Sequence, residues 1–443
     1  MADLGNKLID ICNEIWIFRR SPGIWRDSES EPETEENLIY KRLDGLRTLV
    51  LPLTSKLIDL KNLRIDKNDF FVEINTLVSS LNSKEHFFPA PYAYIPVPQP
   101  DDYIDMLSHS LLFAIQAYNL DYTDIKKSSL KALIERCVKT LTTEGNFFHD
   151  SENSEACWAG TTIFESGLEN IEVKSTYFTS QVVISLSAWI IWAKNQTFKN
   201  KQDEIKRIEI LLSEACRWIL KQNDGKKILM ISGDDDKIPQ INEIVTINST
   251  ALTACFLCNS ILGEGEKNKT IEMTEKFIDL LFDRKKEIIY ADWYHQVATK
   301  VIGPQYYVDR QENFGILSFL GLASKHMKDK WKGKIEEIAD FLISEYIDNI
   351  IIKDEYIGCL PWFIEDLITS DLIFNVSTEK IEISKRKIKE AISKTLMENS
   401  IIDFIGNSVI KNITDLINQD RYDTISKAKK IRIPRKKQKN NKV

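Results

Sequence analysis

The chain has 443 residues, of which 43% are hydrophobic and 28% charged, proportions typical of a folded globular protein. It contains only 16 glycines and 12 prolines, roughly half the usual frequency of each, which argues against a turn-rich all-β fold and favours many helices. The net charge of −7 is unevenly placed: residues 427–443 hold nine Lys and Arg and no acid, which leaves 50 basic and 66 acidic residues elsewhere.

The N-terminal segment MADLGNKLIDICNEIWIF carries acidic side chains among its apolar residues. A secretory signal needs a basic start and an unbroken apolar run, so we expect none here. The chain has seven cysteines, an odd number, scattered through apolar stretches. This pattern favours reduced, buried thiols in a cytoplasmic protein over a disulfide framework.

Two kinds of helix are predicted to alternate along the chain. Helices of the first kind are apolar on nearly all sides, so they must be buried by other elements on every side. They are expected at 102–120, 175–193, 249–262 and 313–326. Helices of the second kind have apolar residues at intervals of three and four and one charged face; they are expected at 124–141, 205–222, 269–282 and 334–348. Segments 36–60 and 66–82 are expected to form an earlier pair, and 383–397 with 399–418 a last one.

The run STYFTSQVVISLSAWIIWA, residues 175–193, is long enough to span a membrane. It contains Ser, Thr and Gln, however, and a helix buried on all sides has the same composition. We therefore expect a core helix and no membrane contact.

The fully apolar helices recur about every 65–75 residues, a longer period than that of short-repeat solenoids. Fully apolar helices wrapped by one-faced helices indicate an inner and an outer ring, so the predicted fold is an all-α, α/α toroid. It is expected to occupy residues 1–420, followed by a basic C-terminal tail at 421–443. Within it, Asn223-Asp224-Gly225 is expected to end an outer helix, because glycine accepts the left-handed conformation found after a helix.

Two stretches, ACRWILKQNDGKK (215–227) and VKSTYFTSQVVISL (173–186), resemble an outer-helix ending and the inner helix of the terpenoid-cyclase and protein-prenyltransferase superfamily. The resemblance covers about half of the chain. It implies a central cavity lined by the N-terminal ends of the inner helices and by the loops between helices. It does not extend to the family's catalytic motifs. The acids Asp234–Asp236 lack the spacer of the cyclase Asp-x-Asp-Asp motif, and no cysteine stands near Asp292 and His295 to complete a prenyltransferase zinc site.

No metal and no cofactor are therefore expected. Cys255 and Cys258 form a lone Cys-x-x-Cys inside an apolar helix, which favours packing thiols over a metal site.

The densest group of polar and aromatic residues lies in two connections, 149–166 and 291–313, each joining an outer helix to the next inner helix. Tyr, Arg and carboxylate side chains around an apolar cavity are what a ligand site needs, although an ordinary polar linker would also contain them. The candidate ligand-binding residues are Asp292, Trp293, His295, Tyr306, Tyr307, Asp309, Arg310 and Glu312, together with His149, Trp158 and Glu165.

Three functions are compatible with this sequence. The preferred one is a non-catalytic toroid that binds a ligand or a protein partner, as an accessory subunit of a larger assembly. The second is an enzyme acting on an isoprenoid, peptide or glycan substrate, with acid and base residues in loops 149–166 and 291–313.

The third function is a nucleic-acid accessory protein that makes weak contacts through residues 427–443. A solvated tail that only keeps the protein soluble would have the same composition. The candidate nucleic-acid-binding residues are Lys429, Lys430, Arg432, Arg435, Lys436 and Lys437.

Overall fold

The computed structural model describes four long stretches and several shorter ones. These are residues 9, 12–13, 16, 19–21, 24–25, 35–54, 58–83, 104–163, 170–198, 200–222, 241–290 and 315–345. This part of the chain is 77% helical, and its strands form only short two-stranded pairs. The protein is therefore all-α, as the low glycine and proline content predicts.

The helices follow one another in five pairs along the described chain. The pairs are α2 (Glu35–Thr54) with α3 (Lys67–Ser83), α4 (Ile104–Tyr118) with α5 (Lys127–Leu141), α6 (Thr176–Lys194) with α7 (Lys201–Lys221), α8 (Ile241–Leu257) with α9 (Glu264–Tyr290), and α11 (Gly315–His326) with α12 (Asp329–Glu345). A single 3-10 turn, η1 (Leu60–Asn62), lies within the first connection.

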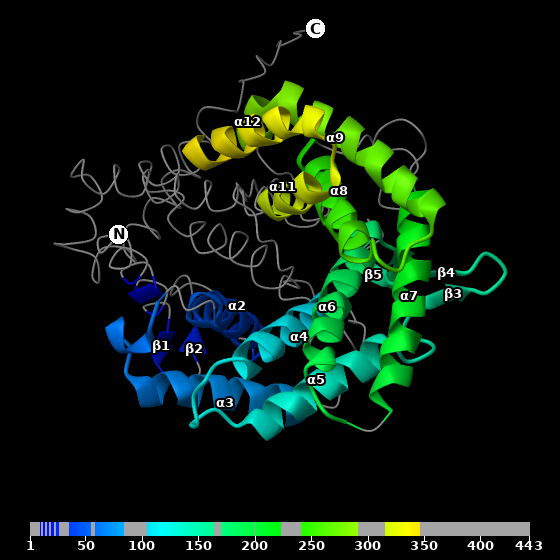
Figure 1. The fold of residues 1–443 in the computed structure, drawn as a ribbon. Coiled ribbons are helices and arrows are strands. Elements are labelled where there is room, and N and C mark those ends of the chain that lie inside the picture. Colours follow the sequence, from blue (N-terminus) through cyan, green and yellow to red (C-terminus); the bar gives the residue numbers. More distant parts are fainter. Residues whose placement is uncertain are drawn as a thin grey trace, which may run out of the picture.

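The five pairs are arranged as two curved layers, one inside the other (Figure 1). The inner layer runs α2, α4, α6, α8, α11, and each of these helices packs against the next. The outer layer runs α3, α5, α7, α9, α12, with each helix packed on the inner helix that precedes it in the chain. The described helices trace an open arc, with the first pair at one end and the last pair at the other.

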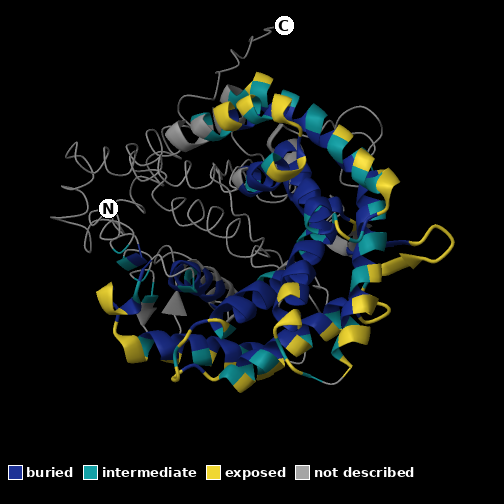
Figure 2. Cartoon of the chain, in the orientation of Figure 1, coloured by how far each residue is buried: buried dark blue, intermediate teal, exposed yellow. Residues whose placement is uncertain are grey.

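Burial follows the two layers. In α6, 14 of 19 residues are buried, against 9 of 21 in its outer partner α7. Figure 2 shows buried residues along the inner row and exposed residues on the outward side of the outer row. The predicted difference between fully apolar and one-faced helices is thus confirmed, because inner helices contact neighbours on more sides than outer helices do.

Helix α6 is both long and apolar. It is long and apolar enough to cross a membrane by those two criteria, the one such helix among the described residues. However, 72% of its apolar window is buried inside the protein, which supports the interpretation of α6 as a core helix.

Neighbouring inner helices run parallel to one another. Tyr118, the last residue of α4, makes an edge-to-face contact with Trp192 near the end of α6, with 5.3 Å between ring centroids. In the same way, Phe256 near the end of α8 stacks on His326, the last residue of α11, at 5.0 Å. The N-terminal ends of the inner helices therefore lie on one side of the arc.

A lysine caps the inner helix in two successive pairs. The ammonium group of Lys127, the first residue of α5, donates to the carbonyl groups of Tyr118 and Leu120 at the end of α4. Lys201, the first residue of α7, donates to the carbonyls of Lys194 and Gln196 at the end of α6, at 3.3 and 2.7 Å. Cations suit helix C-termini, because the last carbonyl groups of a helix have no partner within it.

The N-terminal segment packs on the first helical pair through a buried ion-pair network. The carboxylate of Glu73, on α3, lies 2.8 Å from Nε of Arg19 and 2.7 Å from Nε of Arg42. Arg19 belongs to a short hairpin, β1 (Arg19–Ser21) with β2 (Ile24–Trp25), and β2 packs on α2. Burial lowers the pKa of Arg42, and the carboxylate of Glu73 opposes that effect.

The connection between α5 and α6 contains strands where the sequence predicts a loop. It forms two antiparallel hairpins, β3 (Phe148–Asp150) with β4 (Glu155–Cys157), and β5 (Ala159–Ile163) with β6 (Asn170–Lys174). The first hairpin projects outward beside α7, and β4 packs against that helix. Short alternating segments next to polar turns give too weak a local signal to predict such strands.

Most predicted helices agree with the observed ones to within a few residues. Helix α8 begins at Ile241, earlier than predicted, and α9 extends from Glu264 to Tyr290 on both sides of the predicted range, with non-helical backbone angles at Arg284. Helix α7 ends at Lys221, one residue before the predicted end. The Asn223-Asp224-Gly225 turn, segments 383–397 and 399–418, and the tail at 421–443 lie outside the described residues.

Candidate functional site

Two of the predicted ligand-binding residues, His149 and Trp158, lie within the described chain. The other predicted residues of connections 149–166 and 291–313 lie outside it: Glu165, Asp292, Trp293, His295, Tyr306, Tyr307, Asp309, Arg310 and Glu312. The acids Asp234–Asp236 and the tail residues Lys429, Lys430, Arg432, Arg435, Lys436 and Lys437 also lie outside it.

Trp158 is a core residue. Its side chain is fully buried, and its indole N–H donates to the carbonyl of Leu141, the last residue of α5, at 3.1 Å. Its backbone holds the start of α6: its carbonyl accepts from the N–H of Ser175 at 3.1 Å, and its own N–H donates to Oγ1 of Thr179 at 3.0 Å. Trp158 thus joins the second helical pair to the third.

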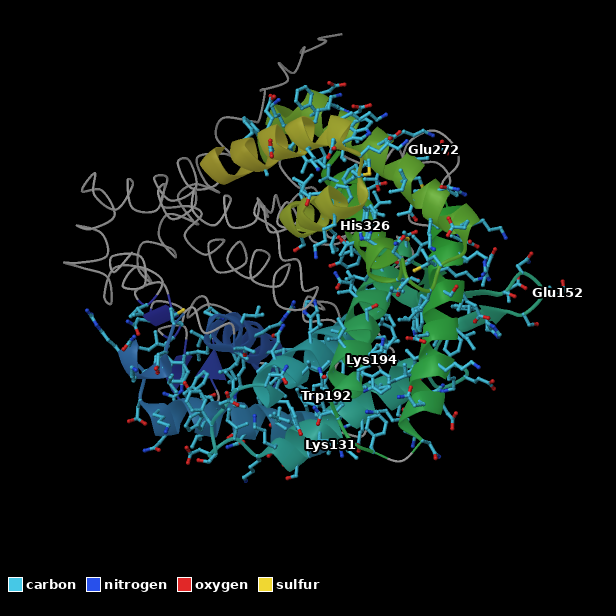
Figure 3. All side chains as sticks on the ribbon, viewed as in Figure 1. Lys131, Glu152, Trp192, Lys194, Glu272 and His326 are labelled. Atoms are coloured by element: carbon cyan, nitrogen blue, oxygen red, sulfur yellow. The ribbon has the colours of Figure 1, made fainter. Side chains whose placement is uncertain are left out.

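His149 lies at the surface on β3, with about 45% of its side chain exposed. Its Nε2 is 3.3 Å from a carboxylate oxygen of Glu214, on α7. Two further α7 residues hold the same hairpin, one turn apart on one helix face: Arg217 donates to the carbonyl of Ser154 at 2.6 Å, and Lys221 donates to the carboxylate of Glu155 at 2.9 Å. Figure 3 shows Glu152 at the tip of this hairpin, away from the arc.

The two described candidates therefore do not share a site. Both rings contact Phe147, with centroid distances of 6.2 Å to His149 and 5.5 Å to Trp158. One of them, however, faces water and the other lies in the core. Within the described chain, no group of three or more His, Cys, Asp or Glu side chains could hold a metal ion.

A different set of polar residues distinguishes the inner layer. Most buried, uncharged polar side chains of the described helices belong to inner helices, which are otherwise apolar. They are Ser108, Ser110 and Gln116 on α4, Thr176, Thr179, Ser180, Ser185 and Ser187 on α6, Asn248, Ser249, Thr250 and Thr253 on α8, and Ser318 on α11. On the outer helices the corresponding residues are Thr270 and Thr274, both on α9.

The inner side chains of α6 and α11 include several in the first turns of these helices, Thr176, Thr179, Ser180 and Ser318, whereas those of α8 lie in its middle and later turns. Ser175 caps α6 by accepting from the N–H of Phe178 at 3.2 Å, and the hydroxyl of Ser180 donates to the carbonyl of Thr176 at 2.6 Å. The α11 terminus approaches α8 closely, since a Cβ atom on Gly315 would lie 3.4 Å from Oγ of Ser249.

Several inner polar groups have no protein hydrogen-bond partner among the described residues. They are the hydroxyl groups of Ser108, Ser110 and Thr253, both amide atoms of Gln116, and the indole N–H of Trp192. All of them belong to α4, α6 or α8, and all are buried. Buried polar groups are normally paired, so each of these requires an explanation.

This set was not predicted from the sequence, although Ser and Thr are frequent in the runs SHS, STYFTS and NSTALT of the inner helices. Only the Ser and Thr residues of 175–193 were considered, as evidence against a membrane span. Comparisons with protein-family models, curated proteins and solved structures found no match.

Proposed function

We propose that this protein is an α/α toroid that binds a ligand or a protein partner in the space surrounded by its inner helices, as an accessory subunit of a larger assembly. Five consecutive pairs with the same inner and outer order support the proposal. In this proposal the predicted pair at 383–397 and 399–418 completes the ring. Curved helical repeats generally use their concave surface for binding.

The observation that carries the proposal is the concentration of uncharged polar groups on the inner helices. Packing between helices requires only apolar contact, and each buried polar atom left unpaired costs about 1–3 kcal/mol. Binding sites combine apolar walls with a few polar groups that orient the ligand. In this proposal the partner displaces what covers groups such as Ser108, Ser110 and Thr253, which are buried in the protein alone, and its hydrogen bonds with them explain why α4 and α8 retain them.

The proposal is tested by native mass spectrometry of the full chain purified from its own cells, which measures any mass that remains bound. We expect bound mass on the unmodified protein and its loss in a variant with Ser110→Ala and Thr253→Val. The matched control carries Thr270→Val and Thr274→Val on the outer helix α9, where each hydroxyl bonds its own helix, and should retain the mass.

Three results would overturn the proposal. The first is absence of bound mass on the unmodified protein, and the second is equal loss in the inner and outer variants. The third is loss of the mass on removal of residues 427–443 alone, which would support nucleic-acid binding through the tail instead.

A further inference from the structure

Three cysteine side chains meet in the core between the third and fourth helical pairs. Cys216 lies on the outer helix α7, and Cys255 lies near the end of the inner helix α8, with Cys258 one turn further along the chain. All three are buried, with at most 1% of their surface exposed, and none forms a disulfide. Cys216 is far from the other two in sequence, and the packing of α7 on α8 brings it to them.

The contacts of Cys216 locate it against the last turn of α8. Its Sγ lies 4.0 Å from the carbonyl oxygen of Ala254, which also accepts the backbone N–H of Cys258 at 3.2 Å. This carbonyl belongs to the residue before Cys255, so Cys216 lies against the turn that carries both α8 cysteines, and their thiols contribute to its raised pKa. On the far side, Oγ of Ser187, on α6, lies 3.7 Å from Sγ of Cys258.

The chemistry of the cluster is that of thiols alone. It contains no imidazole or carboxylate, and the described residues hold no group suited to a metal ion. Two neighbouring thiols can instead lose two hydrogens to an oxidant and form a disulfide.

We propose that Cys216, Cys255 and Cys258 form an oxidation-sensitive lock, in which a hydroperoxide converts Cys216 and one of the two α8 cysteines into a disulfide that joins neighbouring helical pairs. In the first step a thiolate attacks the peroxide, which yields a sulfenic acid and releases water or an alcohol. In the second step the facing thiol attacks the sulfenic sulfur and releases water. One hydroperoxide is reduced for each disulfide formed.

Burial sets the conditions for this reaction. Hydrogen bonding with the neighbouring thiols and burial raise the pKa of Cys216, so its reactive thiolate is scarce while α7 rests on α8. Oxidation is therefore slow in the closed arrangement and faster at higher pH or when the two pairs separate. Once formed, the disulfide prevents that separation.

The test is peroxide treatment of the full chain well below its unfolding temperature, followed by peptide mapping without reductant. We expect one main cross-link, between the peptide with Cys216 and the peptide with Cys255 and Cys258, and a rise in the unfolding temperature that reductant reverses. Protein treated in denaturant serves as the comparison, and there we expect mixed pairings that also include Cys12, Cys137 and Cys157.

Variants separate the lock from general oxidation. Cys216→Ala should abolish both the cross-link and the rise in unfolding temperature, whereas Cys137→Ala, at a buried cysteine in α5, should keep both. If either variant fails to fold, the map of the unmodified protein still decides the question. No cross-link to Cys216 in the folded protein, or the same mixture with and without denaturant, would overturn the proposal.

Discussion

The indole N–H of Trp158 lies 3.1 Å from the carbonyl oxygen of Leu141, to which it donates a hydrogen bond across the boundary between two helical pairs. Trp158→Phe keeps most of the packing but leaves this buried carbonyl without its donor. We expect a loss of about 1–3 kcal/mol in the free energy of unfolding, measured in urea, and about 3–5 kcal/mol for Trp158→Ala. The matched control is Trp192→Phe, since that indole N–H has no protein partner among the described residues. An equal loss in both phenylalanine variants would contradict the assigned role.

Glu73 neutralises the buried Arg42 and the partly buried Arg19, so its removal should be costly. Glu73→Gln leaves the buried guanidinium group of Arg42 without its carboxylate and removes one of the two carboxylates that pair with Arg19. We expect a loss of about 3–5 kcal/mol in the free energy of unfolding. The control is Asp69→Asn, because Asp69 pairs with Arg19 at 3.1 Å but is half exposed, and should cost under about 1 kcal/mol. Comparable losses in the two variants would show that burial is not the decisive factor.

Lys127 and Lys201 cap inner helices at equivalent positions, and we expect their removal to lower the free energy of unfolding by different amounts. Lys127→Met removes a partly buried cation whose pKa is lowered by burial and which bonds two helix-end carbonyls. We expect it to lower the free energy of unfolding by about 1.5–3 kcal/mol. Lys201→Met, with one longer contact of 3.3 Å, should cost less. Lys131→Met, on the same helix as Lys127, removes only a 3.8 Å pair with Glu135 and should change stability by under about 0.5 kcal/mol.

His326 should make stability depend on pH. Burial, and then the charge of Lys325, lowers its pKa below the ordinary value of 6.5. Below that pH the unfolded chain takes up a proton that the folded protein resists, so the contribution of His326 to stability is present at neutral pH and lost as pH falls through the folded pKa.

The variant His326→Phe keeps the stacking on Phe256 without a titratable group. When unfolding in urea is measured between pH 7.5 and pH 5, the free energy of unfolding should decrease less in the variant than in the unmodified protein. Equal decreases would mean that His326 titrates normally. Figure 3 locates this residue on α11, in the inner layer.

His149 provides a test of the predicted ligand-binding set. Its contact with Glu214 is a surface pair, so His149→Ala should lower the free energy of unfolding by under about 1 kcal/mol. If the residue only holds the hairpin, binding or activity assays should be unchanged. A large effect on binding, with stability preserved, would restore His149 as a functional residue.

Much of the architecture was predictable because helical periodicity is a local property. The apolar residues of α7 recur at intervals of three and four, whereas those of α6 surround the whole helix. The first pattern indicates a helix that packs on one face, and the second indicates a helix that packs on all sides. The ends of α6 and α7 followed from neighbouring residues in the same way. The hairpins β3–β4 and β5–β6 were missed because short strands depend on what they pack against.

The candidate site was less predictable, because spacing along the chain does not say which side chains meet. His149 and Trp158 are close in sequence, yet one faces water and the other the core. The Ser and Thr residues of the inner helices are present in the sequence, but no local pattern shows that these helices are neighbours. Only the packing of the inner helices places their hydroxyl groups in one layer.

By itself, the sequence determined that this protein is helical and that two kinds of helix alternate, since both properties depend on residues within a few positions of each other. Tertiary structure alone decided that Cys216 reaches the last turn of α8, and that Arg19 reaches Glu73. Contacts of this kind join distant segments, and they depend on how whole helices pack and not on any local pattern.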